Sequence, residues 1–578
     1  MNNSWKYAGF IKIRMIILIA SFGVVAIFSS VAGYYADALR VPPWSTLIPK
    51  IEQKIEKIRG KPSEMERNLA LIETTFLQLK GKILRPPDAD WINGGALTVR
   101  GSMLMIMDHR GRFFATDGEQ SIEFLDRLKP PVNGLVDYLQ VASSPRYDKM
   151  LHKPERFRFN DLTWIQTDKF SGFAISYTFF DLTRECYGTR VAWAAVDSSR
   201  SLESLAIAPE DWKVVFETKP CLKLNPTWTA LDGMMAGGRM AFKPPSTLFL
   251  GSGEYHLDGI HTYDAGIQSD ASSYGKVIAI DLLDGSSRIV SKGHRNIQGV
   301  TLDGSGRLWI TEQGVRGGDE LNLVKDGGNY GWPLESLGTL YSGQAMPGQR
   351  SYGRHDAFEP PIFAWLPSAG VSCLTVVDNI DESWDGDLLA GSLSSTEFGQ
   401  SLWHIRINGE RVVFVERIRL NQRVRYVIQF GKQIAVWMDN NNLVLFTPRR
   451  RPDPLSSATS WLMRTQSAAV GDQVGKILMA CNECHSFAEK DHRTGPSLNG
   501  VVGRAVAGTT FNGYSQSLRS IGGRWTDERL ASFLADPGGF AQGSPMPSQG
   551  LQKGPVMDAL IGALRQVDGE ASPDLRYH

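Results

Sequence analysis

The chain has 578 residues, of which 42% are hydrophobic and 21% are charged. These proportions are ordinary for a globular protein, and the length predicts several domains, or one large repeat fold and a small domain. The formal net charge of +1 is not the basic balance that is typical of nucleic-acid-binding proteins, so no such partner is expected. The basic run Arg449–Arg451 lies between two prolines and is interpreted as part of a solvated linker over residues 448–468.

Near the N-terminus, Lys12 and Arg14 precede an apolar run that extends from Met15 to about residue 35. About 20 apolar residues can cross a bilayer as one helix, with the positive flank in the cytoplasm. A cleaved signal peptide is the alternative, because Ala36-Asp37-Ala38 resembles a cleavage site, but the run exceeds the ~7–15 residues usual for such peptides. We expect residues 1–35 to be a single-pass anchor in the cytoplasmic membrane, with most of the chain in the periplasm.

Residues 36–90 are predicted to form a helical stalk that follows the anchor. Apolar residues recur there at spacings of three, four or seven, which is typical of one face of a helix. They are Ile51, Ile55, Ile58, Leu69, Ile72, Phe76 and Leu79. The Gly-Lys-Pro sequence at residues 60–62 would break this helix.

From about residue 91 to residue 447, short β-rich runs alternate with turn residues. A hairpin pattern recurs, in which a polar turn joins two apolar strands, at residues 105–114, 240–249, 300–309 and 427–436. Hairpins repeated at intervals of tens of residues are typical of a propeller, and about 350 residues with four strands in each blade suit six blades. The fold is therefore predicted to be mainly β, a six-bladed β-propeller. A pair of β-sandwiches is the alternative.

The chain has five cysteines. Cys186 and Cys221 could form a disulfide in an oxidising compartment, although the sequence does not decide which cysteines pair. Cys373 would then be a small buried hydrophobic residue.

The two remaining cysteines lie in Cys481-Asn482-Glu483-Cys484-His485, which has the C-x-x-C-H spacing of a covalently attached haem c. The cysteine sulfurs add to the haem vinyl groups, and the histidine is placed to bind the iron. Met546 follows further along, and a thioether is the usual second axial ligand in cytochromes c. A zinc knuckle or a redox-active cysteine pair is the alternative, but zinc needs two further ligands, and this segment offers only His492.

Residues 469–570 resemble a class I cytochrome c, an all-α electron-transfer domain. The motifs that carry the resemblance, besides C-x-x-C-H, are Thr494-Gly495-Pro496, Gly500–Arg504, Tyr514-Ser515, Trp525-Thr526 and the loop of Met546. The resemblance implies that Cys481 and Cys484 hold the haem and that His485 and Met546 are the axial ligands. It also implies that the Pro496 carbonyl accepts a hydrogen bond from the ligating histidine, and that Tyr514 and Trp525 lie near the haem propionates.

Three blocks within the predicted propeller resemble the soluble quinoprotein glucose, aldose and sorbosone dehydrogenases. They are residues 293–299 (GHRNIQG), 311–322 (TEQGVRGGDELN) and 328–333 (GNYGWP). Members of that family are six-bladed propellers that oxidise sugars with pyrroloquinoline quinone (PQQ) and calcium.

This resemblance assigns roles to several residues. It implies that Arg295 polarises a quinone oxygen and that further side chains hold the quinone carboxylates, namely Asn296, Arg423 and Arg425. It implies that calcium, which prefers oxygen ligands, is bound by the turn of Gln313, Gly314 and Val315.

The chain departs from the family pattern at three places. The catalytic histidine of the family stands four residues before the arginine of Gly237-Gly238-Arg239, where this chain has Met235, and methionine cannot accept a proton. The family lysine is missing from residues 390–395, and Tyr426 replaces an acidic residue. His256 or His261 could serve as the base instead, although each is more simply interpreted as a structural histidine.

Two functions are therefore weighed. The first is a membrane-anchored periplasmic oxidoreductase, in which the propeller oxidises a sugar or alcohol and the fused haem passes electrons to a respiratory acceptor. Tethering keeps the haem at a high effective concentration. The second is a catalytically degenerate propeller that serves as a binding or scaffold module beside a working cytochrome. Arg295, Arg423 and Arg425 favour the first, and Met235 favours the second.

Overall fold

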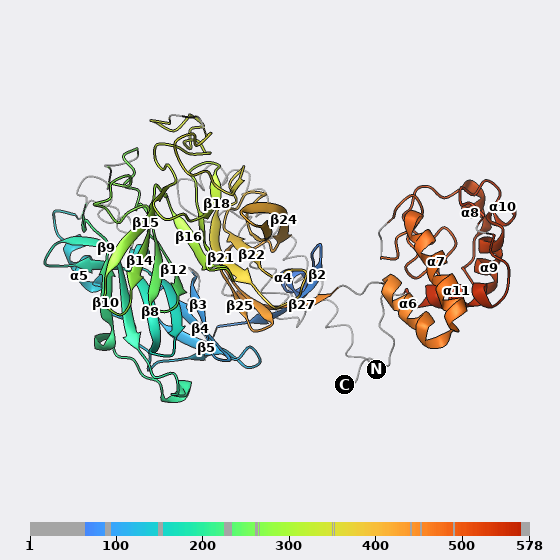
Figure 1. The fold of residues 1–578 in the computed structure, drawn as a ribbon, viewed down its shortest axis with the longest axis horizontal. Helices are drawn as coiled ribbons and strands as arrows, with labels where there is room; N and C mark the ends of the chain where they lie inside the picture. The colour runs from blue at the N-terminus through green and yellow to red at the C-terminus, as the bar shows by residue number, and fades with distance from the viewer. Residues whose placement is uncertain are drawn as a thin grey trace, which may run out of the picture. The chain divides into compact units, whose positions relative to one another are not determined.

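The computed structural model describes residues 64–86, 94–147, 154–224, 234–260, 264, 266–349, 351, 353–439, 442–450, 454–488, 492–548 and 550–567. The chain divides into two compact units after Arg449. Strands make up most of the first unit and helices make up the second (Figure 1). No helix in the described ranges is long and apolar enough to cross a membrane, and the predicted anchor at residues 1–35 lies outside them.

The strands of the first unit form six antiparallel sheets, each of which is one blade. Blade one contains β3 (Gly95–Arg100), β4 (Met103–Asp108), β5 (Phe113–Thr116) and β6 (Glu123–Phe124). Blade two contains β7 (Phe159–Gln166), β8 (Ser171–Asp181), β9 (Cys186–Ala195), β10 (Lys213–Glu217) and β11 (Leu222–Lys223). Blade three contains β12 (Gly237–Lys243), β13 (Thr247–Ser252), β14 (Lys276–Asp281), β15 (Ser287–Lys292) and, in parallel with β15, β19 (Gly328–Asn329).

Blade four contains β16 (Ile297–Leu302), β17 (Leu308–Glu312), β18 (Asp319–Leu323) and β20 (Phe363–Trp365). Blade five contains β21 (Val371–Val377), β22 (Asp387–Ser392), β23 (Ser401–Asn408) and β24 (Arg411–Arg419). Blade six contains β25 (Val424–Phe430), β26 (Gln433–Met438), β27 (Asn442–Arg450), β2 (Leu77–Leu84) and β1 (Leu71–Glu73). The first strands of the blades adjoin in the order β3, β7, β12, β16, β21, β25 and back to β3, which confirms the six-bladed propeller.

Strands from both ends of the propeller close the ring, because β2 pairs with β27 in blade six. The prediction of a helical stalk over residues 36–90 is wrong at this point. Only α4 (Glu64–Ala70) is helical among its described residues, and residues 71–73 and 77–84 are strands. Leu77 and Leu79 are buried on the alternating face of β2. Their spacing fits a strand as well as a helix, and the free edge of β27 decides the outcome.

Five of the six inner strands begin with a β-bulge. The ladder shifts register at residues 159/161 in β7, 237/239 in β12, 297/299 in β16, 371/373 in β21 and 424/426 in β25. A bulge leaves one residue unpaired and re-aims its side chain. The bulged residues are Asn160, Gly238, Gln298, Ser372 and Arg425.

The hairpin pattern that recurs in the sequence marks a kind of turn, and it does not stand at the same place in every blade. In two copies, the carboxylate of Asp108 or Asp303 accepts a hydrogen bond from the Nε of Arg112 or Arg307, each at 2.7 Å, and closes the turn. Three copies join the first and second strands of a blade, whereas residues 105–114 join the second and third. The motif therefore predicts the hairpins but not their position within the blade.

The disulfide between Cys186 and Cys221, which the sequence left open, is present in blade two. Cys186 at the start of β9 is bonded to Cys221, which is 35 positions further along the chain, and their Cα atoms are 5.6 Å apart. Cys373 is buried, as predicted.

Removing this disulfide should destabilise the propeller. In the C186A/C221A variant we expect the free energy of unfolding to fall by roughly 2–4 kcal/mol, because closing a loop of this length restricts the unfolded chain. Urea unfolding followed by tryptophan fluorescence measures the change, and C373A is the control for loss of a buried cysteine. An unchanged midpoint in the double variant would contradict the prediction.

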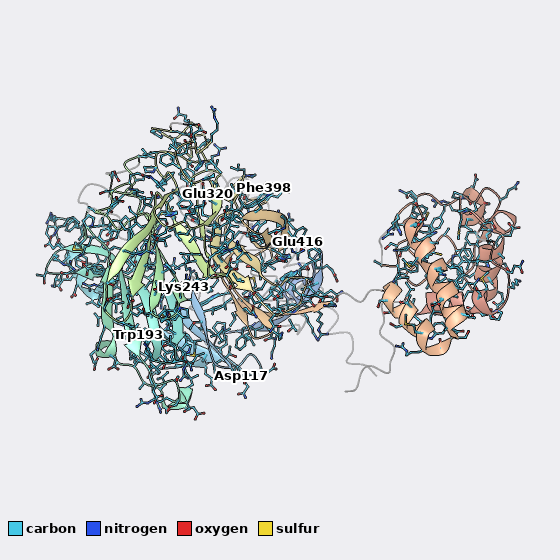
Figure 2. The ribbon with its side chains drawn as sticks, viewed as in Figure 1. Asp117, Trp193, Lys243, Glu320, Phe398 and Glu416 are labelled. Carbon is cyan, nitrogen blue, oxygen red and sulfur yellow. A yellow bond between two sulfur atoms is a disulfide. The ribbon has the colours of Figure 1, made fainter. Side chains whose placement is uncertain are left out.

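A buried charge network fastens the N-terminal hairpin to blade five. His404 Nε2 lies 2.7 Å from Asp387 Oδ2, and His404 Nδ1 lies 3.6 Å from Glu416 Oε2. Glu416, which is labelled in Figure 2, also accepts hydrogen bonds from the amide and hydroxyl of Thr75, at 2.5 and 2.9 Å. Arg406 forms an ion pair with Asp387 at 2.9 Å.

This network should make the unfolding free energy of the propeller depend on pH. Burial alone would lower the pKa of His404, but the hydrogen bond to Asp387 and the negative charges of Asp387 and Glu416 outweigh it and raise the pKa above the usual 6.5. The stabilisation is therefore complete below pH 6.5 and is lost as the pH rises through the folded-state pKa. We expect H404Q to lower the unfolding free energy by about 1–3 kcal/mol at pH 6 and by less at pH 9. A difference that does not change between pH 6 and pH 9, in urea unfolding, would contradict this.

The second unit is a bundle of short helices. They are α6 (Pro454–Thr465), α7 (Ala468–Cys484), α8 (Gln516–Ile521), α9 (Asp527–Ala535), α10 (Pro537–Phe540) and α11 (Pro555–Arg565). Ala458 and Leu462 of α6 are buried in its core. The prediction of a linker over residues 448–468 is therefore wrong for residues 454–465, where apolar residues spaced by four form a packed helix.

Candidate functional site

A largely apolar cavity of about 400 Å³ lies within the helical unit. Cys481 and Cys484, in the last turn of α7, line it together with His485, and Met546 lines it from a distant loop. Tyr514 and Trp525, predicted near the haem propionates, line it as well. The helices thus bring together two thiols, an imidazole and a thioether around one apolar space.

The histidine is oriented by its neighbours. Its Nδ1 donates a hydrogen bond of 2.7 Å to the Pro496 carbonyl, as the sequence predicts. This tautomer leaves Nε2 without a proton, as a metal ligand requires. Gly495 packs against the ring, and a Cβ atom at that position would lie only 2.4 Å from His485 Cε1. The residues therefore fit a haem c, with Met546 available as a second ligand.

A second cavity, of about 380 Å³, lies in the propeller at the bulged ends of the inner strands. Four of the five bulged residues line it, namely Asn160, Gln298, Ser372 and Arg425. The predicted residues Asn296, Arg423 and Gln313 line it too, as does Met235. The bulges thus direct side chains from four different blades into one space.

The wall of this cavity is strongly cationic. Five arginines line it, whereas Glu155 is the only carboxylate among the described lining residues. The arginines are Arg156, Arg158, Arg239, Arg423 and Arg425. Arg425 and Asp439 form an ion pair at 2.6 Å, and Asp439 is shared with Arg423 at 3.5 Å.

The charges of the arginines oppose one another. Burial, together with the nearby guanidinium groups of Arg425, Arg239 and Arg156, lowers the pKa of Arg158 to about 10. Burial and Arg425 also lower the pKa of Arg423. Among the described residues, Asn160 Nδ2 is buried without an acceptor. A wall of crowded cations with a buried, unused donor fits a ligand that carries several negative charges.

Asp161 takes the place of the acidic residue that Tyr426 replaces. The Tyr426 hydroxyl donates a hydrogen bond of 2.8 Å to Asp161 Oδ1, and its ring lies under the guanidinium of Arg239, 4.4 Å away. Arg239 Nη1 lies 3.5 Å from the same carboxylate oxygen. An acid of blade two thus lies beside Tyr426 of blade six. Leu393 lines the cavity from the segment without the family lysine.

Arg295 lies behind the wall that Asn296 and Gln313 form. Its side chain is buried, and its Nη1 donates hydrogen bonds to the carbonyls of Gln313 and Gly314, at 3.0 and 2.5 Å. Its Nη2 is buried without an acceptor among the described residues. These two carbonyl groups were predicted to bind calcium, and Arg295 already occupies them.

His256, one of the two predicted replacement bases, does not reach the described lining of the cavity. His256 lies just after β13 and is not among the lining residues, and His261 lies outside the described residues. Val315 is buried and packs with Ile267 and Trp332, away from the lining. Met235 does line the cavity. The position that holds the catalytic histidine in the family therefore presents a thioether to the cavity in this chain.

Sequence reasoning missed Arg156, Arg158 and Asn160. Arg156 ends the 3₁₀ turn Pro154–Arg156, Arg158 immediately precedes β7, and Asn160 is the bulged residue of β7. All three lie before the part of the chain that carries the family blocks. No pattern of one regular element marks them as a site, because they come from a turn, a connecting residue and a bulge.

Comparison with known proteins agrees with both units. The glucose / sorbosone dehydrogenase family model matches residues 174–445. An uncharacterized protein of Synechocystis is 31% identical over 294 residues, which are 46% of this chain and 65% of that protein. The aldose sugar dehydrogenase YliI of Escherichia coli is 31% identical over 237 residues, 38% of this chain and 58% of that enzyme. The chain thus spans less than two thirds of these propeller relatives.

The propeller fold also matches a solved structure. The soluble aldose sugar dehydrogenase of Escherichia coli, in its apo form, is 22% identical with a TM-score of 0.50, over 64% of this chain and all of that one. Cytochrome c2 of Afifella marina is 31% identical over 103 residues, which are 17% of this chain and 83% of that protein. The C-terminal unit therefore belongs to the cytochrome c family, and it follows a propeller of the glucose / sorbosone dehydrogenase type.

Proposed function

We propose that this protein is an exported, membrane-anchored oxidoreductase that oxidises a sugar or alcohol in its propeller and passes the electrons to its own haem, and from there to a respiratory acceptor. The observation that carries the proposal is the arginine-lined cavity of the propeller. PQQ carries carboxylates on a rigid aromatic frame, and arginine binds carboxylates through two parallel hydrogen bonds. The disulfide and the haem motif both favour an oxidising compartment, which supports export.

The residues of the cavity would divide the work. Arg158, Arg423 and Arg425 would hold the carboxylates, and Asn160 Nδ2 would donate to an oxygen of the same ligand. When bound, the quinone would supply the acceptor for two electrons from the substrate carbon. Glu155 would accept the proton of the substrate hydroxyl at a carboxylate oxygen, since Met235 cannot.

The haem provides the test of this function. The full chain, loaded with haem, is given PQQ, and the absorption of the haem is followed as aldoses and simple alcohols are added. Haem reduction that requires both PQQ and substrate supports the proposal. PQQ that does not bind, with a haem that dithionite still reduces, would instead support a scaffold propeller beside a working cytochrome, the function that Met235 favours.

Arg158 gives a sharper expectation for the cofactor. We expect R158M to weaken PQQ binding roughly 10- to 100-fold, because it removes one charge-assisted contact of about 1.5–3 kcal/mol. Without ligand, the unfolding midpoint should stay the same or rise, because the substitution removes a buried positive charge from a cluster of like charges. Quenching of tryptophan fluorescence measures binding. R288M, on the exposed Arg288 that pairs with Asp326, is the control, and equal PQQ affinity in both variants would contradict the assignment.

A further inference from the structure

The turn that should hold calcium is filled by a guanidinium group. Arg295 Nη1 lies 3.0 Å from the Gln313 carbonyl oxygen and 2.5 Å from that of Gly314. The Arg295 side chain is only 3% exposed. It lies over the ring of Trp332, with its Cζ 5.4 Å from the ring centre, and its Nε is 3.4 Å from Glu254 Oε1. Packing on several sides therefore holds this cation against the two carbonyl groups.

The side-chain oxygens of Gln313 and Asp319 at the turn already have hydrogen-bond partners. The Gln313 side chain accepts from Asn296 and donates to the Val371 carbonyl. Both oxygens of Asp319 accept hydrogen bonds, from the amides of residues 314, 370 and 371 and from the hydroxyl of residue 368.

The acid at the end of β17, just before the turn, also has hydrogen-bond partners. Glu312 accepts from His294 Nδ1, from the Arg295 amide and from Asn322. Within the described ranges, no group of three or more His, Cys, Asp or Glu residues could hold a metal ion.

A calcium ion does not fit beside this guanidinium. Calcium binds oxygen at about 2.3–2.6 Å and takes about six to eight ligands. An ion on the carbonyls of Gln313 and Gly314 would stand within about 5 Å of a second cation that cannot give up its proton. Either the ion or the arginine must leave, and the arginine is held by packing.

We propose that Arg295 takes the place of calcium in this propeller. Its fixed charge neutralises the carbonyl groups of the turn and gives a positive potential behind the cavity wall at Asn296 and Gln313. The fold of the turn is then independent of calcium, and so is binding of the anionic ligand. The second statement rests on the proposed function, whereas the first does not.

Calcium binding tests the first statement directly. The full chain with its haem is unfolded in urea in EDTA and in excess calcium, with the propeller followed by tryptophan fluorescence and the cytochrome by its haem absorption. Ligand at about 100 times its dissociation constant raises the folding equilibrium about 100-fold. We expect no such change for the propeller. A calcium-dependent rise in its midpoint would overturn the proposal.

The variant R295Q tests whether Arg295 is the group that excludes calcium from the turn. In R295Q the two carbonyl oxygens and the Glu254 carboxyl lose their cation, so the midpoint in EDTA should fall and calcium should partly restore it. R316Q is the matched control, since Arg316 lies in the same turn and is exposed, with its Nη1 3.4 Å from the Tyr341 carbonyl. A variant R295Q that folds and ignores calcium would show that Arg295 is not what excludes the ion. If R295Q does not fold, the wild-type measurement still decides.

PQQ titration separates this proposal from the proposed function. Equal PQQ affinity in EDTA and in calcium supports the second statement. Binding that needs calcium would overturn calcium independence and leave the oxidoreductase function intact. Failure to bind PQQ under either condition would overturn the oxidoreductase function, and the unfolding data would still report on Arg295 alone.

Discussion

The C481A/C484A variant should carry no covalently bound haem. Both thiols lie in the last turn of α7 and line the apolar cavity with His485, and no other described cysteine lines it, because Cys186 and Cys221 are bonded to each other and Cys373 is buried in the propeller. We expect complete loss of haem peroxidase staining at 64.0 kDa after denaturing electrophoresis. All substrate-dependent haem reduction should be lost with it.

Two further variants make this result specific. C373A should stain as strongly as the wild type, because that thiol is outside the haem cavity. M546L should keep the covalent haem but lower its reduction potential, because a thioether ligand raises the potential. Haem staining that persists in C481A/C484A would contradict the assignment of the C-x-x-C-H motif. A potential unchanged in M546L would remove Met546 as the axial ligand.

The sequence predicts the haem centre almost completely. The attachment motif is contiguous, and the resemblance to cytochrome c implies the Pro496 contact, so the hydrogen bond of 2.7 Å to His485 is found as expected. The propeller cavity is harder to predict, because its lining comes from bulges that start the inner strands of several blades. Whether a strand begins with a bulge depends on pairing with its neighbour, which sequence patterns do not reveal. Asn160, the bulged residue of β7, was missed for this reason.

The sequence also does not show which distant residue lies beside a position where a family residue is missing. Tyr426 stands where an acid is expected, yet its hydroxyl contacts Asp161, which is 265 positions away along the chain. Residues 71–84 were predicted as helix because their apolar spacing suits helix and strand alike, and pairing with β27 settled the matter. In both cases a tertiary contact decides what the local sequence does not show.

Glu155→Gln should reduce substrate oxidation by roughly 100-fold or more in kcat, the usual contribution of a positioned base. Glu155 belongs to the short 3₁₀ turn Pro154–Arg156 and is the only carboxylate among the described residues that line the cavity. Glutamine keeps the size of the side chain but cannot take a proton from the hydroxyl. The measurement is the rate of haem reduction by the full chain with PQQ and a substrate that the wild type oxidises.

The readouts must separate proton transfer from cofactor binding. PQQ affinity in E155Q should equal or exceed that of the wild type, because the change removes a negative charge from an anion site, and E155D should recover part of the rate. E210Q is the control, since Glu210 lies in another exposed 3₁₀ turn, Pro209–Asp211, and does not line the cavity. A rate in E155Q equal to that of E210Q would exclude Glu155 as the base. Met235 cannot serve and His256 does not line the cavity, so H261A would then be the next variant to measure, with water or the ligand itself as the other acceptors of the proton.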